Sequence, residues 1–425
     1  MVEYKKTKAC ERNRNMSNTV KPTKQQLEFL GWEIGAFFHF GIRTFYEGHS
    51  DWDGKPMPLE GFNPANLDCE QWIKTAKDGG AKYAILVCKH HDGFANWPSK
   101  YTDYSVKNTP WKDGKGDVVR EFTDACRRYG LKVGLYYSPA QFGSREMNST
   151  EYDDYFINQI SELLTDYGKV DYLWFDGCGS EGHEYDTKRI VGEIRRLQPE
   201  ILLFNMWDPD TRWVGNECGL AQMPNVNVVN ELAFSVMTDT KDALDQDVFL
   251  PVECDFRIRD HWFYSENDSA SLKSTDELMG NYLYSVGRGA NMLLNIAPDR
   301  NGRLPQKDAQ RFIDFGKRIQ AKYGSPLEEI KKPTVTDGKI VIELEEPALI
   351  DSVLLTEDIT NCEKARCVKV YATPLWCGDP IHIANAQSIG HKLILSFPPV
   401  RTGKVVIEVS GDDGMDITSV SVFAH

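Results

Sequence analysis

Histidine, aspartate and aromatic side chains follow the apolar segments of this chain at the points where those segments end. The apolar run YAILVC ends in Lys89, His90 and His91, and the run VDYLWF ends in Asp176, which a glycine follows. An aspartate at such a position can act as a nucleophile or a base, and adjacent histidines can donate hydrogen bonds to a ligand. These residues therefore predict a site for covalent or acid–base chemistry.

Other apolar runs end in similar groups. The first run, AFF, is followed by His39, a later run ends in two tyrosines, and the run after residue 248 carries acids and arginines. A purely structural protein has little reason to place so many polar groups at the ends of apolar segments. The further candidates are Tyr136, Tyr137, Asn205, Trp207, Glu253, Asp255, Arg257 and Arg259.

Three histidines raise the alternative of a catalytic metal. His39 is followed by Phe40 and Gly41, so the His-x-His spacing of many metal-dependent hydrolases is missing. The chain also has no HExxH motif and no Cys/His pair with the spacing of metal ligands. We therefore expect no metal and no other cofactor, and we expect the histidines to donate hydrogen bonds to a hydroxylated ligand.

Asp176 needs a second carboxyl group if the reaction is glycoside hydrolysis, which uses one carboxylate and one carboxylic acid. Spacing leaves three candidates open, namely Glu217 in RWVGNECG, Glu231 in VVNELAF and Glu253 in LPVECDF. The aromatic-flanked loop around Glu217 would suit an acid whose pKa must be raised by its surroundings.

The segments that carry these residues alternate between strand-like and helix-like patterns from about residue 30 to about residue 325. In one predicted helix, DVVREFTDACRRYG, Asp117 is the expected N-cap and Gly130 the expected stop. Near-continuous apolar strands alternating with helices indicate a parallel sheet, and without a GxGxxG turn they favour a closed (β/α)8-like barrel. The weakest strand is assigned to residues 226–234, so the barrel is expected to be irregular there. Active-site groups of such barrels lie at the C-terminal ends of the strands, where the candidates stand.

The pattern changes after residue 328. Short alternating strands separated by turn residues, without helical periodicity, predict an antiparallel β-sandwich. We therefore predict an N-terminal extension (1–24), a catalytic barrel (25–328) and a sandwich (329–425). Two sandwich aromatics, Tyr371 and Trp376, could contact a glycan, although packing against the barrel is the simpler role for this domain.

The composition of the chain limits the classes of molecule that it can bind. The net charge of −14 disfavours nucleic acid and anionic membranes, both of which would be repelled. The N-terminus has no apolar signal segment, and the ten cysteines form no CxxC pair. We therefore expect a cytoplasmic protein with reduced thiols. A secreted or periplasmic location is the alternative if a native signal has been removed.

Four motifs together, HFGI, KHHDGF, LYYSP and WFDG, resemble the α-L-fucosidases of glycoside hydrolase family 29. The resemblance extends from about residue 25 to about residue 305 and includes SVGRGANMLLNIAPDRNGRLP. It implies a retaining, metal-independent hydrolase built from a (β/α) barrel and a C-terminal β-sandwich. The expected partner is a fucosylated oligosaccharide or glycoconjugate.

The resemblance also assigns roles. It implies that Asp176 is the nucleophile. The stretch WVGNECG resembles the branch that cleaves α-1,3 and α-1,4 fucosides of Lewis-type glycans, which makes Glu217 the expected acid/base ahead of Glu253 and Glu231. Here Asp51-Trp52 stands where the family usually has Glu-Trp, and FRIRDHWFY departs from an IRPGWFY-like motif. The residues implied to hold the sugar are His39, Asp51, Trp52, His90, His91, Tyr137, Arg259 and Trp262.

The sequence thus favours a retaining exo-α-L-fucosidase for α-1,3/α-1,4 linkages on branched glycans. Two alternatives remain open. One is a broad-specificity α-L-fucosidase that acts on simple α-fucosides, and the other is a non-catalytic fucose-binding lectin.

Overall fold

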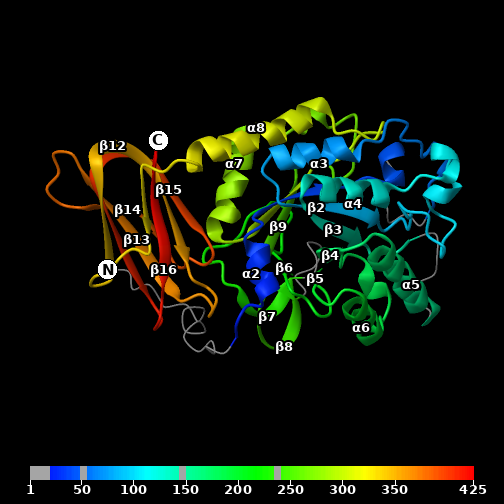
Figure 1. Ribbon diagram of the computed structural model, residues 1–425, viewed down its shortest axis with the longest axis horizontal. Coiled ribbons are helices and arrows are strands. Elements are labelled where there is room, and N and C mark those ends of the chain that lie inside the picture. The colour runs from blue at the N-terminus through cyan, green and yellow to red at the C-terminus, as the bar shows by residue number, and fades with distance from the viewer. Residues whose placement is uncertain (1–19, 48–54, 143–149, 234–240) are drawn as a thin grey trace, which may run out of the picture.

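The computed structural model describes residues 20–47, 55–142, 150–233 and 241–425. Two bodies lie side by side, a barrel covered by helices and an all-β domain formed by the C-terminal part of the chain (Figure 1). No helix within the described ranges combines the length and the apolar character needed to cross a membrane.

The barrel is an eight-stranded, all-parallel sheet with the order β5-β4-β3-β2-β1-β10-β9-β6. This architecture confirms the predicted (β/α)8-like barrel. Its strands are β1 (Ile34–Phe38), β2 (Tyr83–Lys89), β3 (Lys132–Tyr137), β4 (Tyr172–Phe175), β5 (Leu202–Phe204), β6 (Arg212–Trp213), β9 (Val252–Arg257) and β10 (Asn291–Asn295).

The irregular part of the barrel lies between β5 and β6. A single parallel bridge, between Phe204 and Thr211, joins the two edges of the sheet there. The assignment of residues 226–234 to a barrel strand was wrong. These residues form β7 (Val228–Ala233), which pairs with β8 (Lys241–Phe249) in a separate antiparallel ribbon. The two-residue β6 takes the expected place, and it is too short to produce a recognisable apolar run.

Helices cover the outside of the barrel (Figure 1). In α4 the Asp117 side chain accepts a hydrogen bond from the backbone N–H of Arg120, and Gly130 ends the helix at φ +73°, both as expected. The helices are α2 (Lys24–Leu30), α3 (Cys69–Asp78), α4 (Val118–Tyr129), α5 (Thr150–Asp166), α6 (Thr187–Leu197), α7 (Thr275–Tyr284) and α8 (Gln306–Tyr323).

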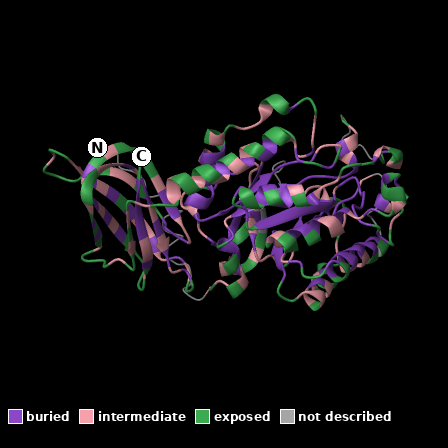
Figure 2. Ribbon diagram, turned by 45° about the horizontal axis from the view of Figure 1, so that its top comes forward, coloured by how far each residue is buried: buried purple, intermediate pink, exposed green. Residues whose placement is uncertain are grey.

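The barrel strands are buried on both faces, whereas the helices expose their outer sides (Figure 2). Alternate residues of a strand belong to different cores, because successive side chains point to opposite faces. On β3, Leu135 and Tyr137 pack in the layer between strands and helices, and Tyr136 packs inside the barrel with Phe37 and Trp174. Every residue of a barrel strand is thereby assigned either to the interior or to the outer layer.

The C-terminal domain is a six-stranded antiparallel sheet with the order β11-β16-β12-β15-β13-β14. Register shifts in the pairing of the long strands β12 and β15 let the sheet fold over its own apolar core, which confirms the predicted β-sandwich. Its strands are β11 (Glu328–Lys331), β12 (Lys339–Glu357), β13 (Ala365–Pro374), β14 (Ile381–Ala386), β15 (Leu393–Gly411) and β16 (Ile417–Ala424).

Polar contacts join the two bodies. Lys322 of α8 pairs with Asp351 of β12, and Glu363, which lies between β12 and β13, accepts hydrogen bonds from Asn227 of the barrel. Ile359 of the same segment packs against Val228 and Phe249 of the ribbon. Lys392 and His391 of the sandwich also pair with Glu33 before β1, so several separate contacts hold the sandwich against the barrel.

Candidate active site

The C-terminal ends of the barrel strands bring the predicted residues together. His39 follows β1, His90 and His91 follow β2, and Asp176 follows β4. The ring centroids of His39 and His90 lie 5.8 Å apart, and those of His90 and His91 lie 4.3 Å apart. Because all the strands are parallel, side chains distant in sequence meet on one rim of the barrel.

Asp176 lies at the centre of a hydrogen-bond network. Its Oδ2 accepts a hydrogen bond of 2.7 Å from the Tyr136 hydroxyl, and Nε2 of His91 lies 3.4 Å from the same oxygen. Its Oδ1 accepts a hydrogen bond from the backbone N–H of Cys178 at 2.9 Å. The carboxylate is thus held on both oxygens, while its side chain remains 24% exposed. A ligand above the rim can reach it.

These contacts keep the carboxyl group ionised. Burial would raise the pKa of Asp176, but the charge and hydrogen bond of His91, the charge of His90 and the Tyr136 hydroxyl outweigh it and hold the pKa well below its usual range. An ionised, oriented and partly exposed carboxylate is suited to nucleophilic attack.

The His91 ring is held by its neighbours. Its Nδ1 lies 2.5 Å from the Ser138 hydroxyl, which donates to the carbonyl of Ala140. These contacts orient Nε2 of the ring towards Asp176.

Asn295 of β10 connects two other candidates. Its Oδ1 lies 2.8 Å from Nδ1 of His39, and its Nδ2 donates to the backbone carbonyl of Trp262 at 2.8 Å. The rings of His39 and Trp262 lie 4.8 Å apart at an angle of 31°. The predicted aromatic Trp262 therefore does lie at the histidine rim, in the loop after β9.

Glu217 lies on the same rim. Its Oε2 is 3.4 Å from Nη1 of Arg257, and its side chain is 33% exposed. Burial raises the pKa of Glu217, Arg257 and a hydrogen bond from Trp262 lower it, and the negative charge of Asp176 raises it further. The net pKa is above the usual value, which favours a carboxyl that still holds its proton. Asp176 and Glu217 are close enough for their charges to interact, yet their proton affinities are shifted in opposite directions.

The loop that carries Glu217 is fixed from both sides. Trp213 of β6 donates from Nε1 to Oδ1 of Asp255 inside the barrel at 2.6 Å. Cys218 pairs with Phe256 of β9 in an antiparallel bridge, and its carbonyl accepts from Asn281 Nδ2 at 2.7 Å. This loop is therefore anchored to β9 and to α7.

Tyr137 does not lie at this rim, in contrast to the role implied by the resemblance. Its hydroxyl donates to Oε1 of Gln159 in α5 at 2.7 Å, and its ring packs on Phe156 in the outer layer. The preceding residue, Tyr136, faces the interior and contacts Asp176. Its ring also stacks on His90 at 5.6 Å and 8°. The alternation of side chains along β3 separates the two tyrosines.

Arg259 also lies elsewhere. Its guanidinium is buried between Asp268, at 3.0 Å, and Asp308 of α8, at 2.7 Å. Arg257 takes the place at the rim instead, next to Glu217 and with its guanidinium carbon 5.1 Å from the Trp262 ring centroid. Arg257 is two residues from Asp255 and four from Glu253, so the period of a strand points all three inward.

The two reserve acids are placed away from Asp176. Glu253 is buried in the barrel interior, where Tyr83 donates to it at 2.6 Å and Trp174 at 2.8 Å. Glu231 is an exposed residue of the β7–β8 ribbon. Neither position provides a proton donor next to Asp176.

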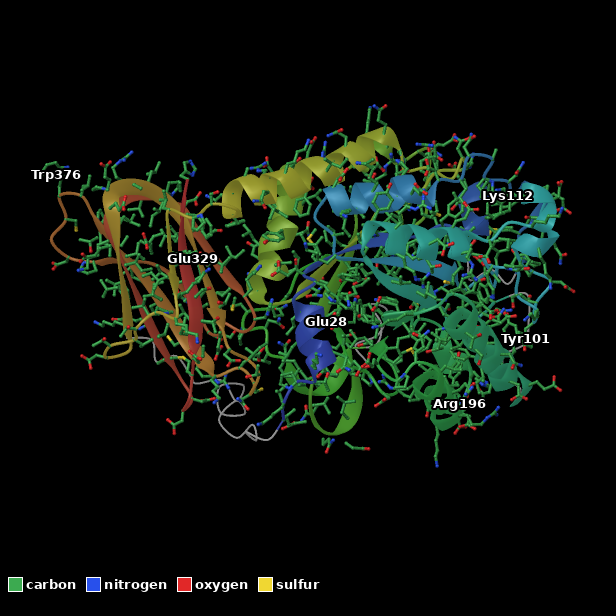
Figure 3. All side chains as sticks on the ribbon, viewed as in Figure 1. Glu28, Tyr101, Lys112, Arg196, Glu329 and Trp376 are labelled. Atoms are coloured by element: carbon green, nitrogen blue, oxygen red, sulfur yellow. The ribbon has the colours of Figure 1, made fainter. Side chains whose placement is uncertain are left out.

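Four predicted contacts remain. Tyr371 lies in β13, and its hydroxyl donates to Oε2 of Glu408 in β15 at 3.0 Å. Asp51 and Trp52 lie outside the described residues. Trp376 follows β13 in the sandwich and is completely exposed, at the end of the domain remote from the barrel (Figure 3). Packing against the barrel is therefore excluded for this tryptophan.

The same rim offers a possible set of metal ligands. One ligand atom each from His90, His91 and Asp176 lies within 4.8 Å of the others. The histidine spacing in the sequence did not suggest this set, because it needs Asp176 from another strand. Activity in the presence of a chelator is the measurement that decides whether a metal takes part.

The comparisons with known proteins agree with this geometry. The sequence model of the family described as Alpha-L-fucosidase matches residues 2–324. Alpha-L-fucosidase 1 of Arabidopsis thaliana is 37% identical over 320 residues, which cover 72% of this chain and 62% of the plant protein. A relative from Oryza sativa is 36% identical, and 58% of its length is covered. The chain thus spans less than two thirds of these relatives.

Solved structures match over more of their length. A glycoside hydrolase 29 family member from an unknown rumen bacterium has a TM-score of 0.87 and 32% identity, with 95% of this chain and 77% of that chain covered. A Ruminococcus gnavus GH29 fucosidase in complex with fucose has a TM-score of 0.82 and 26% identity, with 96% and 95% covered. Both barrel and sandwich therefore have counterparts in known structures.

Proposed function

This chain belongs to the α-L-fucosidase family, and we propose that it is a retaining exo-α-L-fucosidase that removes terminal α-1,3- or α-1,4-linked L-fucose from branched, Lewis-type glycans. One observation carries the proposal. The pKa values of two carboxyl groups on the same rim are shifted in opposite directions: that of Asp176 is lowered and that of Glu217 is raised. A retaining glycosidase needs one ionised carboxylate and one protonated carboxyl group.

The reaction follows from these two states. The ionised Asp176 attacks the anomeric carbon while the protonated Glu217 gives its proton to the leaving oxygen, and a covalent fucosyl-enzyme forms. Glu217 is then a carboxylate and takes a proton from water, which attacks the same carbon and releases fucose with net retention. Arg257, 3.4 Å from Glu217, stabilises the carboxylate formed between the two steps.

The residues around the two carboxyl groups suit a 6-deoxy sugar. His39 and His90 offer ring nitrogens that can hydrogen-bond hydroxyl groups, and the His91 ring, held by Ser138, orients Asp176 beside them. The Trp262 indole, next to His39, offers an apolar face for the edge of the sugar that carries a methyl group. The Ruminococcus gnavus relative in complex with fucose supports fucose as the sugar that this chain recognises.

The α-1,3/α-1,4 preference rests on the WVGNECG motif around Glu217, which resembles that branch of the family. Glu217 stands on the rim with Arg257 and Trp262, as an acid/base must. The position of Glu217 supports its role as the acid/base, whereas the linkage preference rests on the resemblance of the motif.

Fucose release tests the proposal. A Lewis-type trisaccharide, 2′-fucosyllactose and an aryl α-L-fucoside should be compared at equal concentration, each with and without a chelator. We expect release from the trisaccharide, slow release from 2′-fucosyllactose, and no effect of the chelator. Proton NMR of the first-formed fucose should show the α-anomer, because retention preserves the configuration.

The other outcomes identify the alternatives. Comparable release from all three substrates would make the enzyme a broad-specificity α-L-fucosidase. The absence of turnover together with fucose binding would favour the lectin. Loss of activity with the chelator would assign a metal to His90, His91 and Asp176.

A further inference from the structure

A buried carboxyl group of the sandwich, that of Glu363, bonds a residue of the catalytic domain. Glu363 lies between β12 and β13 and is 5% exposed. Its Oε1 accepts from Nδ2 of Asn227 at 2.6 Å, and its Oε2 accepts from the backbone N–H of the same residue at 3.1 Å. A buried carboxyl group with both oxygens bonded to one barrel residue fixes that residue firmly.

Asn227 lies at the end of the segment that carries Glu217. The carbonyl of the neighbouring Val226 accepts from Nη2 of Arg212 at 2.9 Å, and Arg212 stands at the start of the same segment, in β6. Arg212 and Glu363 are also close enough for each charge to act on the pKa of the other. Arg212 therefore joins the two ends of residues 212–227 to each other, next to the residue that Glu363 holds.

Strand β6 connects this anchored segment to Glu217. Arg212 and Trp213 are adjacent in β6, so their side chains point to opposite faces. Arg212 reaches outward to the residues that Glu363 holds, and Trp213 reaches inward to Asp255 at 2.6 Å. Glu217 follows Trp213 by four residues and stands next to Arg257. A shift of β6 would move the carboxyl group that must donate the proton.

We propose that Glu363 is a positioning residue for Glu217, through which the sandwich holds the Asn227 end of the barrel segment that carries the acid/base. The proposal rests on the proposed function of Glu217. Removal of Glu363 frees the Asn227 end of the segment, which Arg212 joins to β6, and so displaces the proton donor; a displacement of about 1 Å can cost about a hundredfold in rate.

The experiment uses the dependence of kcat/KM on the leaving group. A nitrophenyl fucoside has a good leaving group and needs little help from an acid, whereas a phenyl fucoside needs it. For Glu363→Ala we expect the ratio of kcat/KM for phenyl over nitrophenyl fucoside to fall by about tenfold or more. Glu363→Gln should restore most of the ratio, because its amide can bond both groups of Asn227 once the Asn227 amide is flipped.

Asp351→Ala is the matched control. It removes another contact between sandwich and barrel, the one with Lys322 of α8, without touching residues 212–227. We expect this variant to leave the ratio unchanged. If Glu363→Ala does not fold, Asn227→Ala, which removes only the side-chain donor, should lower the ratio in the same direction.

Equal loss on both fucosides in Glu363→Ala or Asn227→Ala would overturn the proposal and leave Glu363 a purely stabilising role. Failure of the proposed function looks different. In that case the unaltered protein would hydrolyse neither fucoside, or Glu217→Ala would show no dependence on the leaving group.

Discussion

The Tyr136 hydroxyl donates a 2.7 Å hydrogen bond to Oδ2 of Asp176, whereas the hydroxyl of the next residue, Tyr137, bonds Gln159 in the outer layer. Two adjacent tyrosines thus serve different parts of the molecule. Tyr136 stabilises the charge of the proposed nucleophile, and Tyr137 joins β3 to α5.

This difference predicts opposite effects for two similar substitutions. Tyr136→Phe removes a hydrogen bond to a charged group, worth about 1.5–3 kcal/mol, and should lower kcat/KM by about tenfold to a hundredfold with little change in melting temperature. Tyr137→Phe leaves Gln159 without its partner in the core and should lower the melting temperature while keeping kcat/KM. Equal kinetic effects in the two variants would contradict the assignment of Tyr136.

Asp176→Ala should reduce turnover by several orders of magnitude with the fold intact, because no nucleophile remains to form the intermediate. Steady-state kinetics with an aryl fucoside and a circular dichroism spectrum measure the two properties. A small anionic nucleophile such as azide should restore part of the activity and give a fucosyl product of inverted configuration. Activity close to that of the unaltered enzyme would remove Asp176 from this role.

The pKa shifts of the two carboxyl groups predict the shape of the pH profile of kcat/KM. Glu217 must be protonated to donate, so activity should fall as the pH rises through its raised pKa, which lies above the ordinary value of 4.5. Asp176 must be ionised to attack. Because its pKa lies below the ordinary value of 3.8, the loss of activity on the acid side should occur at lower pH than a free aspartate would cause. In Glu217→Gln the alkaline limb should vanish on a nitrophenyl fucoside. An unchanged alkaline limb would assign it to another group.

Arg257 and Arg259 provide a second matched pair. Arg257→Met removes the cation that lowers the pKa of Glu217, so this pKa should rise and the alkaline limb of the pH profile should move to higher pH. Arg259→Met leaves Asp268 and Asp308 buried without their cation. The free energy of unfolding, measured with a denaturant, should therefore fall by about 3–5 kcal/mol. A shifted pH profile in the Arg259 variant alone would reverse these assignments.

Glu253 predicts a pH-dependent stability. Burial raises the pKa of Glu253, and hydrogen bonds from Tyr83, Trp174 and Tyr172 lower it. Burial has the larger effect, so the pKa is about 7. A carboxyl group that holds its proton more tightly when folded stabilises the protein fully below its ordinary pKa of 4.5, and this contribution is lost as the pH rises to about 7. Glu253→Gln cannot titrate, so its melting temperature relative to the unaltered protein should rise between about pH 5 and about pH 8. Parallel curves for the two proteins would contradict a protonated Glu253.

Much of the site could be predicted from the sequence because the barrel has a simple rule. Apolar runs mark buried strands, and the residue after each run stands on the rim. His39, His90, His91 and Asp176 were found in this way, and the structure brings them together. Glu217 was selected by its motif and lies on the same rim, although it follows the two-residue β6, which has no apolar run of its own.

The sequence did not show which of two nearby residues of the same type lies at the site. Tyr136 and Tyr137 both end β3, and Arg257 and Arg259 both follow the run on β9. The inward member is decided by the phase of side-chain alternation, which is set by pairing with the adjacent strands. The inward positions of Glu253 and Asp255 could have indicated Arg257, since all three are separated by two residues.

The barrel, the sandwich and the residue types on the rim could all be predicted from the amino-acid sequence, because hydrophobic periodicity and strand ends are local properties of the chain. The tertiary structure alone shows that the pKa of Asp176 is lowered, that the pKa of Glu217 is raised, and how Glu363 of the sandwich reaches the segment of Glu217. Proton affinity depends on burial and on charges brought close from distant parts of the sequence, and neither exists until the chain has folded.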